Sequence, residues 1–249
     1  LKVRIIPILL LKGNSLVKSV NFSNHRIVGD AMSAVKVFSR RFADEMVVLD
    51  LDAREKGSIN TELLKRISAE CNMPLTFGGG IDSMEKADQA FFCGADKITI
   101  NSSLHKNPQL ISKIASKYGS QAVVISIDIK SEQDNFIPYH SNGEIKSDLT
   151  LKEAISLAHD LGAGEILAND IDNDGVMKGF NMKFVRELRD KIDLPLIIAG
   201  GCSNITDFKK AFDVGVEAVA AASIFHWIGE SIISIKKALH EDDIAVRML

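Results

Sequence analysis

The sequence predicts a single α/β domain, a (β/α)8 TIM barrel made of two similar (βα)4 halves. The chain has 249 residues, and α/β barrels commonly form one domain of about 200–250 residues. Short β-branched runs alternate with longer amphipathic segments, as in chains of βα units. An internal repeat at about half the chain length favours a closed barrel over its structural rival, a doubly wound open sheet. We expect one domain over residues 1–249, with half-barrels of approximately 1–120 and 121–249.

Eight strands and eight helices are expected in strict alternation. The strands are Val3–Leu11, Met46–Leu51, Leu75–Phe77, Lys97–Ile100, Ala122–Ile129, Glu165–Asn169, Leu196–Ala199 and Ala218–Ala221. The helices are Ala31–Phe42, Thr61–Cys71, Met84–Cys93, Pro108–Tyr118, Leu151–Leu161, Met182–Lys191, Ile205–Val214 and Glu230–Leu239. Helix boundary signals support several of them, since Asn107-Pro108 opens one helix and Gly94, Gly119, Gly162 and Gly215 close others.

The repeat aligns residues 77–104 with residues 198–225 without gaps. Glycine, small and aromatic positions agree together, which makes the match specific. The pairs are Gly79 with Gly200, Gly80 with Gly201, Ala90 with Ala211, Gly94 with Gly215 and Ser102 with Ser223. Two such halves close on each other naturally in a barrel.

Each half carries a Gly-Gly loop after one strand and a small or polar tip after the next. Glycines let backbone N–H groups approach an anion closely, and barrel active sites form at the carboxyl ends of the strands. The first predicted phosphate cradle is Gly79, Gly80, Asn101 and Ser102, and the second is Gly200, Gly201, Ala222 and Ser223. A lone Gly-Gly pair could merely form a tight turn, but duplication at matched positions favours a long ligand with a phosphate at each end.

Composition excludes several function classes. A net charge of -3 argues against a nucleic-acid binder with a broad basic surface. Cys71, Cys93 and Cys202 are far apart and have no Cys/His ligand cluster, so we expect reduced thiols, no metal site and no cofactor. The N-terminal apolar run lacks a small-residue cleavage site, and no apolar stretch reaches about 18 residues, so neither a signal peptide nor a membrane span is expected. We therefore predict a cytoplasmic location.

Eight longer stretches resemble one protein family. They are GDAMSAVKVFS, DEMVVLDLDA, FGGGI, GADKITINSS, NPQLISKIASKYGSQAVVISIDIK, GAGEILANDIDNDGVMKGF, AGGCSNITDFKKAF and AASIFH. On these stretches the chain resembles HisF, the cyclase subunit of imidazole glycerol phosphate synthase, over nearly its whole length. The related barrel isomerase HisA shares the architecture, but the SQAVV, GAGEIL and DxDG segments favour HisF.

The resemblance implies an enzyme that works as a heterodimer with a HisH-like glutaminase. Ammonia released there would pass through the barrel and meet the bisphosphate PRFAR at the carboxyl-end face. Addition, cleavage and ring closure, a lyase/cyclase reaction of histidine biosynthesis, would give imidazole glycerol phosphate and the ribotide AICAR.

The resemblance also implies site residues at the mouth. Asp128, at the end of the fifth strand, aligns with a catalytic aspartate of the family, and Asp174 and Asp50 match further mouth carboxylates. Lys18 matches a lysine on the flexible first loop. A loop cap is the structural alternative for Asp174, and an ordinary solvated loop residue is the alternative for Lys18.

At the opposite end, the resemblance implies a ring of charges that closes the ammonia entrance. Arg4, Glu45, Lys97 and Glu165 correspond to this ring. Asp96 matches a residue that faces the glutaminase. The alternative is an ion-pair plug that stabilises the barrel without gating.

The sequence departs from the family pattern at residues expected in the middle of the mouth. Leu10 stands where the family has its other catalytic aspartate, opposite Asp128 in the repeat, and leucine neither accepts nor donates a proton. Asn169 and Asp170 follow the sixth strand where the family commonly has small hydroxyl residues, and Val176 replaces a threonine.

These departures favour a HisF-like paralogue with impaired cyclase chemistry. One such group is linked to bacterial surface-sugar biosynthesis, where the barrel and its glutaminase supply ammonia to convert an acetamido to an acetamidino group, with a separate sugar amidotransferase. Two alternatives stay open. The chain could be a working cyclase that uses Asp128 with Asp50 or Asp174, or a non-catalytic barrel that binds and activates its glutaminase.

Overall fold

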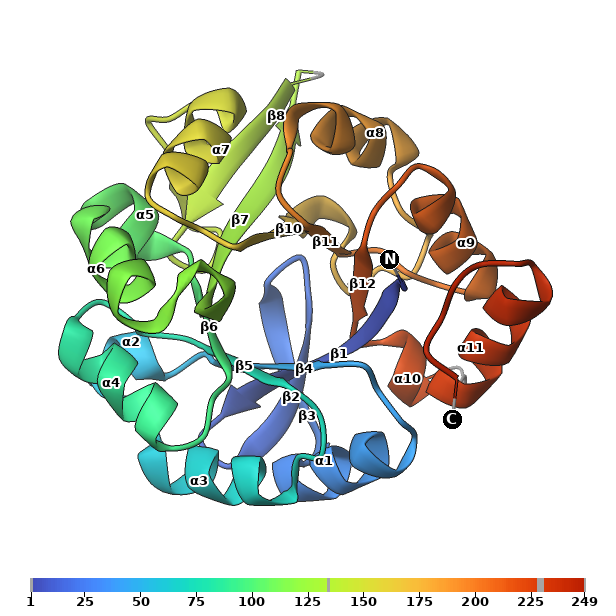
Figure 1. Ribbon diagram of the computed structural model, residues 1–249, viewed down its shortest axis with the longest axis horizontal. Coiled ribbons are helices and arrows are strands. Elements are labelled where there is room, and N and C mark those ends of the chain that lie inside the picture. Colours follow the sequence, from blue (N-terminus) through green and yellow to red (C-terminus); the bar gives the residue numbers. More distant parts are fainter. Residues whose placement is uncertain (1, 134, 228–230, 249) are drawn as a thin grey trace.

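Eight parallel strands form a closed barrel inside a ring of helices (Figure 1). The computed structural model describes residues 2–133, 135–227 and 231–248. Around the barrel the strands follow the order β1-β4-β5-β6-β7-β10-β11-β12, and β12 pairs with β1 to close it. The predicted (β/α)8 barrel is confirmed.

Each predicted barrel strand is present, with ends shifted by a few residues at most. The strands are β1 (Arg4–Lys12), β4 (Met46–Asp50), β5 (Leu75–Gly78), β6 (Lys97–Ile100), β7 (Val123–Glu132), β10 (Glu165–Asp170), β11 (Leu196–Ala199) and β12 (Ala218–Ala221). The largest shift is at the end of β7, which continues beyond the barrel into a hairpin.

The predicted helices also form, and polar N-caps fix the starts of all of them except the one that begins after Pro108. They are α1 (Ala31–Arg40), α3 (Thr61–Glu70), α4 (Met84–Phe92), α6 (Gln109–Tyr118), α7 (Leu151–Asp160), α8 (Met182–Lys191), α9 (Ile205–Asp213) and α11 (Ile232–Glu241). Thr150 and Asn204 form reciprocal capping boxes at α7 and α9. The predicted start of the last helix, Glu230, lies outside the described residues.

The sequence prediction missed two excursions from the carboxyl ends of the strands. The hairpin of β2 (Ser15–Val20) and β3 (Ser23–Asp30) follows β1, while β8 (Asn135–His140) and β9 (Ile145–Lys146) follow β7. Short helices α2 (Ala53–Lys56), α5 (Ser102–Lys106) and α10 (Ile224–Trp227), and single turns η1 (Ser120–Ala122) and η2 (Ile171–Asn173), complete the connections. Because β3 is almost wholly exposed, it has no apolar alternation to reveal it.

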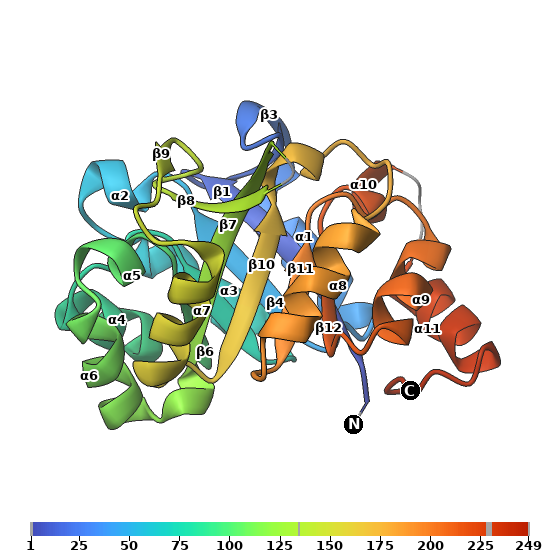
Figure 2. The ribbon, with the colours of Figure 1, turned by 90° about the horizontal axis from the view of Figure 1, so that it is seen from above.

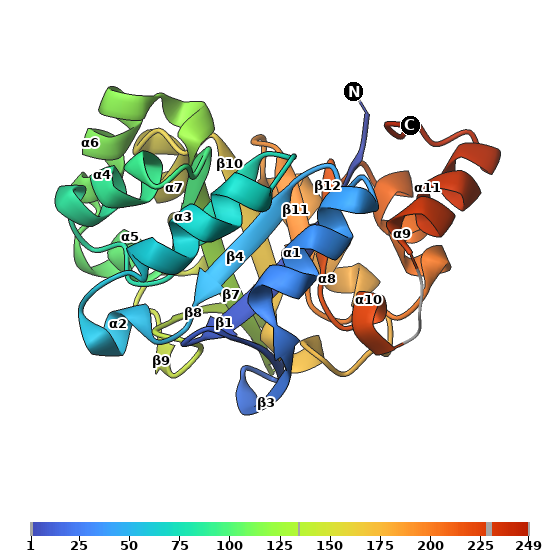
Figure 3. The same cartoon turned by 90° about the horizontal axis from the view of Figure 1, so that it is seen from below.

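The two ends of the barrel are clearly distinct. The β2–β3 hairpin, α2 and β9 project from the end where the strands finish (Figures 2 and 3). Both chain termini lie at the opposite end (Figures 2 and 3). The projecting end is the mouth of the barrel, and the end with the termini is its base.

The core has two layers. One fills the space between strands and helices, and the other fills the barrel lumen with apolar side chains. The lumen cluster consists of Ile6, Ile8, Val47, Val124, Leu167, Ile197, Ala199, Ala218 and Ala220. Among the described residues, no helix is both long and apolar enough to cross a membrane.

Candidate active site at the mouth of the barrel

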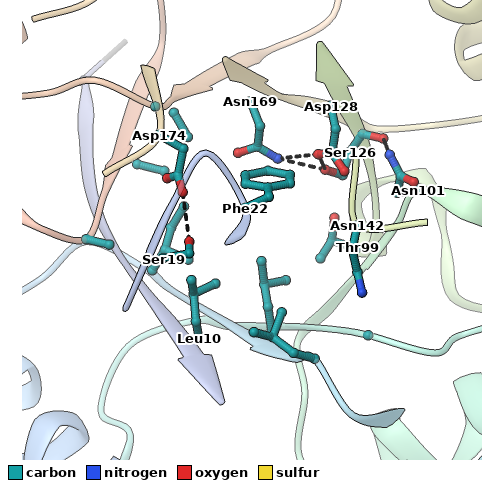
Figure 4. A pocket seen from close by; sticks show the side chains of 18 of the residues that line it. Leu10, Ser19, Phe22, Thr99, Asn101, Ser126, Asp128, Asn142, Asn169 and Asp174 are labelled. Atoms are coloured by element: carbon teal, nitrogen blue, oxygen red, sulfur yellow. Dashed lines mark hydrogen bonds between the residues drawn. The ribbon is translucent and has the colours of Figure 1, made fainter. Parts of the chain in front are cut away.

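A cavity of about 310 Å³ opens at the mouth (Figure 4). Every residue of the two predicted cradles lines it, and so do Asp50, Asp128 and Asp174. The cradles follow β5–β6 and β11–β12, which stand four strands apart in the barrel, so they face each other across the cavity. The structure thus brings the predicted cradle residues and the three predicted acids together, whereas Lys18 is not among the residues that line the cavity. The described residues contain no group of three or more His, Cys, Asp or Glu side chains arranged to hold a metal.

Asp128 is a buried acid that lines the cavity. Its Oδ1 accepts hydrogen bonds from Asn169 Nδ2 at 2.7 Å and from Ser126 Oγ at 3.1 Å. Burial nevertheless raises the pKa of Asp128 to about 6, and the negative charge of Asp174 acts in the same direction. A carboxyl group with this pKa exchanges protons readily near neutral pH.

Asp174 enters the cavity from the loop after β10. Ser19 on the hairpin donates its Oγ proton to Asp174 Oδ2 at 2.9 Å, and Asn21 N donates to the Asp174 carbonyl at 2.9 Å. Burial raises the pKa of Asp174 above its ordinary value. Its carboxylate therefore links the mouth to the hairpin rather than capping its own loop.

Lys18 differs from the expected loop residue. It lies within β2, and only 5% of it is exposed. Its Nζ has no hydrogen-bond partner among the described residues. Burial lowers the pKa of Lys18 to about 7, although the nearby Asp174 charge opposes this shift. An amine with this pKa is partly neutral at pH 7, so it can give up or take up a proton.

The wall opposite Asp128 is apolar. Leu10 lines the cavity from β1, four strands from β7, and pairs in register with Leu49 on β4. Ile8, two residues earlier on β1, extends this wall toward the lumen. Figure 4 shows Leu10 across the cavity from Asp128 and Asn169. No acid replaces the missing aspartate on β1 itself.

The cradle glycines have a packing role as well. A Cβ on Gly79 would lie 2.1 Å from the Asp50 carbonyl oxygen, and one on Gly200 would lie 2.3 Å from that of Asp170. Both glycines have positive φ, 107° and 94°. The same close approach to the neighbouring strand end occurs in both halves, so tight turns alone account for these two glycines.

The Asn101 side chain does not present its amide N–H groups to a phosphate, because backbone carbonyls already accept from them. Its Nδ2 donates to the carbonyls of Ser126 at 3.1 Å and Tyr139 at 3.2 Å, whereas its buried Oδ1 has no partner within the part of the chain that the structure describes. The free Oδ1 can only accept a hydrogen bond, so it suits an N–H or O–H group of a ligand. On β6, just before Asn101, the buried Thr99 Oγ1 also lacks a partner among the residues described.

Asp50 caps the loop that follows β4. Its Oδ1 accepts from the backbone N–H groups of Asp52 at 3.1 Å and Ala53 at 3.2 Å. Burial raises its pKa above the ordinary value. These contacts give Asp50 a structural task at the rim of the cavity.

At the base, the four predicted charges form one ion-pair ring. Arg4 contacts Glu45 at 2.7 Å and also Glu165, while Lys97 Nζ lies 3.0 Å from Glu45 and 3.1 Å from Glu165. The ring carries two charges of each sign. The lumen cluster lies above it, and Ile8, Ala199 and Ala220 of that cluster also line the mouth cavity.

Asp96 is exposed beside this ring. Its Oδ2 accepts from Leu75 N at 2.8 Å, and its own N–H donates to the Leu75 carbonyl at 2.8 Å. It therefore fastens the start of β5 to that of β6.

Sequence reasoning missed several polar residues of the cavity, among them Ser19, Thr99 and Ser126. Thr99 and Ser126 are inward positions of barrel strands, two residues before Asn101 and Asp128, so the period of two could have indicated them. Ser19 gave no such signal, because its place depends on the hairpin.

Comparisons with known proteins agree over the whole length. The model of the family "Histidine biosynthesis protein" matches residues 4–228. A Campylobacter jejuni protein named "Putative imidazole glycerol phosphate synthase subunit hisF2" is 38% identical over 252 residues, covering 100% of both chains. The HisF subunits of imidazole glycerol phosphate synthase from Chlorobium limicola and Dictyoglomus turgidum are 38% and 39% identical over 247 residues, 98% of each chain. The chain therefore belongs to the HisF family of imidazole glycerol phosphate synthase subunits.

Proposed function

We propose that the protein receives ammonia at the base of the barrel and uses or delivers it at the mouth, where a phosphate-bearing ligand binds. The observation that carries this proposal is the mouth itself, where two Gly-Gly loops face each other across a cavity that contains the buried Asp128, above an apolar lumen. Free NH₃ crosses an apolar lumen more easily than NH₄⁺, because burying an unpaired charge is far more costly. The neutral ion-pair ring would then act as a gate.

A HisH-like glutaminase is the proposed ammonia source, bound at the base. The relatives are named as subunits of a synthase, which supports a partner for this chain as well. Phe42 after α1 is 52% exposed, and Phe92 at the end of α4 is 83% exposed. Both helices end beside the starts of barrel strands, at the base, where Asp96 is also exposed. Exposed aromatic side chains of this kind are enriched in protein interfaces.

At the mouth, we propose Asp128 as the general base. Asp174, which also lines the cavity, and the buried Lys18 near Asp174 are further proton-exchanging groups. The cradle loops would bind the ligand's phosphates through their backbone N–H groups, with Ser102 and Ser223 hydroxyls beside them. The missing acid at Leu10 would leave cyclase chemistry impaired.

The finer proposal is a paralogue whose ammonia reaches a surface-sugar acetamido group, with a separate sugar amidotransferase. Leu10 in place of the expected acid supports this role, and the name hisF2 of the Campylobacter relative is consistent with a second HisF-type protein. A neighbouring surface-sugar gene cluster would support it, whereas a histidine operon would contradict it.

A working cyclase is the second candidate, and Asp174 is the observation that favours it. Its raised pKa and its place beside Lys18 would let it supply the acid that Leu10 cannot. In that case Asp174→Asn should abolish turnover of PRFAR with ammonium salt.

The experiment that separates the candidates is turnover of PRFAR with ammonium salt, followed by formation of imidazole glycerol phosphate. The wild-type protein should turn over little, and Leu10→Asp should raise the rate at least tenfold, because general acid–base groups typically contribute about 10²–10⁴-fold. Leu49→Asp is the matched control, since Leu49 is the register partner of Leu10 and also lines the cavity. Rapid turnover by the wild type, or equal gains from both variants, would contradict the proposal.

A further inference from the structure

Asn169 lies directly beside Asp128 and binds one of its two carboxylate oxygens. The two residues are register partners on the parallel strands β10 and β7, so both side chains enter the mouth at the same level. Asn169 Nδ2 donates to Asp128 Oδ1 at 2.7 Å and to Ser126 Oγ at 3.0 Å. Ser126 Oγ donates to the same Oδ1 at 3.1 Å, so two donors converge on one oxygen (Figure 4).

The second oxygen of Asp128 is left available. Among the described residues none donates a hydrogen bond to Oδ2, although Asp128 lines the cavity. Two donors on Oδ1 restrict rotation of the carboxylate group. Oδ2 is therefore the atom that a ligand can reach.

The surroundings of Asp128 oppose its negative charge. Among the described residues, Asp174 after β10 is the charged group that shifts the pKa of Asp128, and its like charge disfavours ionisation of Asp128. Lys18 and His25 on the hairpin instead lower the pKa of Asp174 through their charges. On β8, the register partner Tyr139 donates its hydroxyl to Glu132. Only the hydrogen bonds from Asn169 and Ser126 favour the ionised form.

We propose that Asn169 is the positioning residue of Asp128, keeping its carboxylate ionised and its Oδ2 directed to the ligand. The inference rests on the proposed role of Asp128 as general base. Nδ2 can only donate, so its bond to Oδ1 favours the carboxylate over the carboxylic acid. A serine or threonine hydroxyl, by contrast, can also accept, and its preference for the ionised form is weaker. With Leu10 in place of a second acid, this fixed donor keeps Asp128 available as a base.

The test is a titration of Asp128 by NMR of protein carrying ¹³C-labelled aspartate carboxyl groups, with the signal assigned by Asp128→Asn. The free energy lost when a hydrogen bond to a charged group is removed corresponds to a pKa change of about one to two pH units. Asn169→Leu should therefore raise the titration midpoint of Asp128 by about one to two pH units, and Asn169→Ser should raise it less. Asn173→Leu is the matched control, because Asn173 Nδ2 donates at 2.7 Å to Asp170 Oδ2 and not to Asp128.

An unchanged midpoint in folded Asn169→Leu would overturn the inference, as would an equal shift in Asn173→Leu. Circular dichroism reports folding, and if the leucine variant does not fold, the smaller shift expected for Asn169→Ser decides. The titration needs no substrate. A shifted midpoint together with rapid turnover of PRFAR by the wild type would thus refute the proposed function and keep the positioning role.

Discussion

Removing Lys97 from the charge ring at the base should destabilise the protein strongly. In Lys97→Met the apolar stem is kept, but Glu45 and Glu165 then share Arg4 as their remaining partner in the ring. Both glutamate side chains are nearly buried, at 9% and 7% exposure, while Lys97 itself is 19% exposed. The substitution leaves the ring with one net negative charge.

The size of the effect follows from this burial. Removing one partner of a buried ion pair typically costs 3–5 kcal/mol, because the other charge stays buried without compensation. Lys97 bonds two carboxylates, at 3.0 and 3.1 Å, but water still reaches part of it. We therefore expect a loss of about 3 kcal/mol in the free energy of unfolding. For a domain of this size that loss lowers the melting midpoint by roughly 6–12 °C.

Urea and thermal unfolding measure the loss directly. The double variant Lys97→Met/Glu45→Gln restores a neutral ring, so its loss should be at least about 1 kcal/mol smaller than the sum of the two single losses. Lys117→Met is the matched control, because its bond to Asp88 lies on the surface, and its melting midpoint should not move. Equal melting midpoints for Lys97→Met and wild type would refute the assignment of the ring as a closed, buried network.

Two further predictions concern the mouth. Gly200→Ala should lower the melting midpoint much more than Gly13→Ala, although both glycines have positive φ. The new Cβ at residue 200 would lie 2.3 Å from the Asp170 carbonyl oxygen, whereas a Cβ at residue 13 would have no described atom within 4 Å. Similar losses in the two variants would contradict the steric argument. The pKa of Lys18 is about 7 in the folded protein, against an ordinary value of 10.5 for a lysine in the unfolded chain. Between these two pH values the unfolded chain binds more protons than the folded protein. The free energy of unfolding therefore rises with pH, by up to about 1.4 kcal/mol per pH unit. The stability advantage of Lys18→Met over wild type in urea should therefore shrink from pH 7 to pH 9, and a difference independent of pH would contradict the burial of an unpaired amine.

The barrel could be predicted because its signals are local and repeated. Inward and outward positions of the strands are both buried, so each strand reads as an apolar run, and each helix has its own caps. The gapless repeat then placed the two cradles opposite each other. The placement of Leu10 opposite Asp128 follows from the strand count, because these residues lie on the first and fifth of the eight predicted strands.

The hairpin over the mouth could not be predicted in the same way. Asn21 and Phe22 turn with positive φ of 52° and 60° without a glycine to mark the turn. The hairpin is held instead by contacts far apart in sequence, such as Asn21 Nδ2 to the carbonyl of Ile171 at 3.0 Å. Burial of Lys18 depends on this docking, so a residue expected on a flexible loop becomes an enclosed amine.

The unequal walls of the mouth bear on which chemistry the proposed function can support. Ammonia that arrives through an apolar lumen is already neutral, so its attack on an acceptor needs no base, and one base is enough to remove a proton from the cationic adduct. Cleavage followed by ring closure moves protons at more than one atom, and a second acid across the ligand would serve those steps. With Leu10 facing Asp128, the site is equipped for the addition and less so for the closure. The Leu10→Asp variant should gain turnover of PRFAR, while its affinity for PRFAR measured without ammonia should equal that of the wild type. This outcome would support a role for the added acid in the later proton transfers.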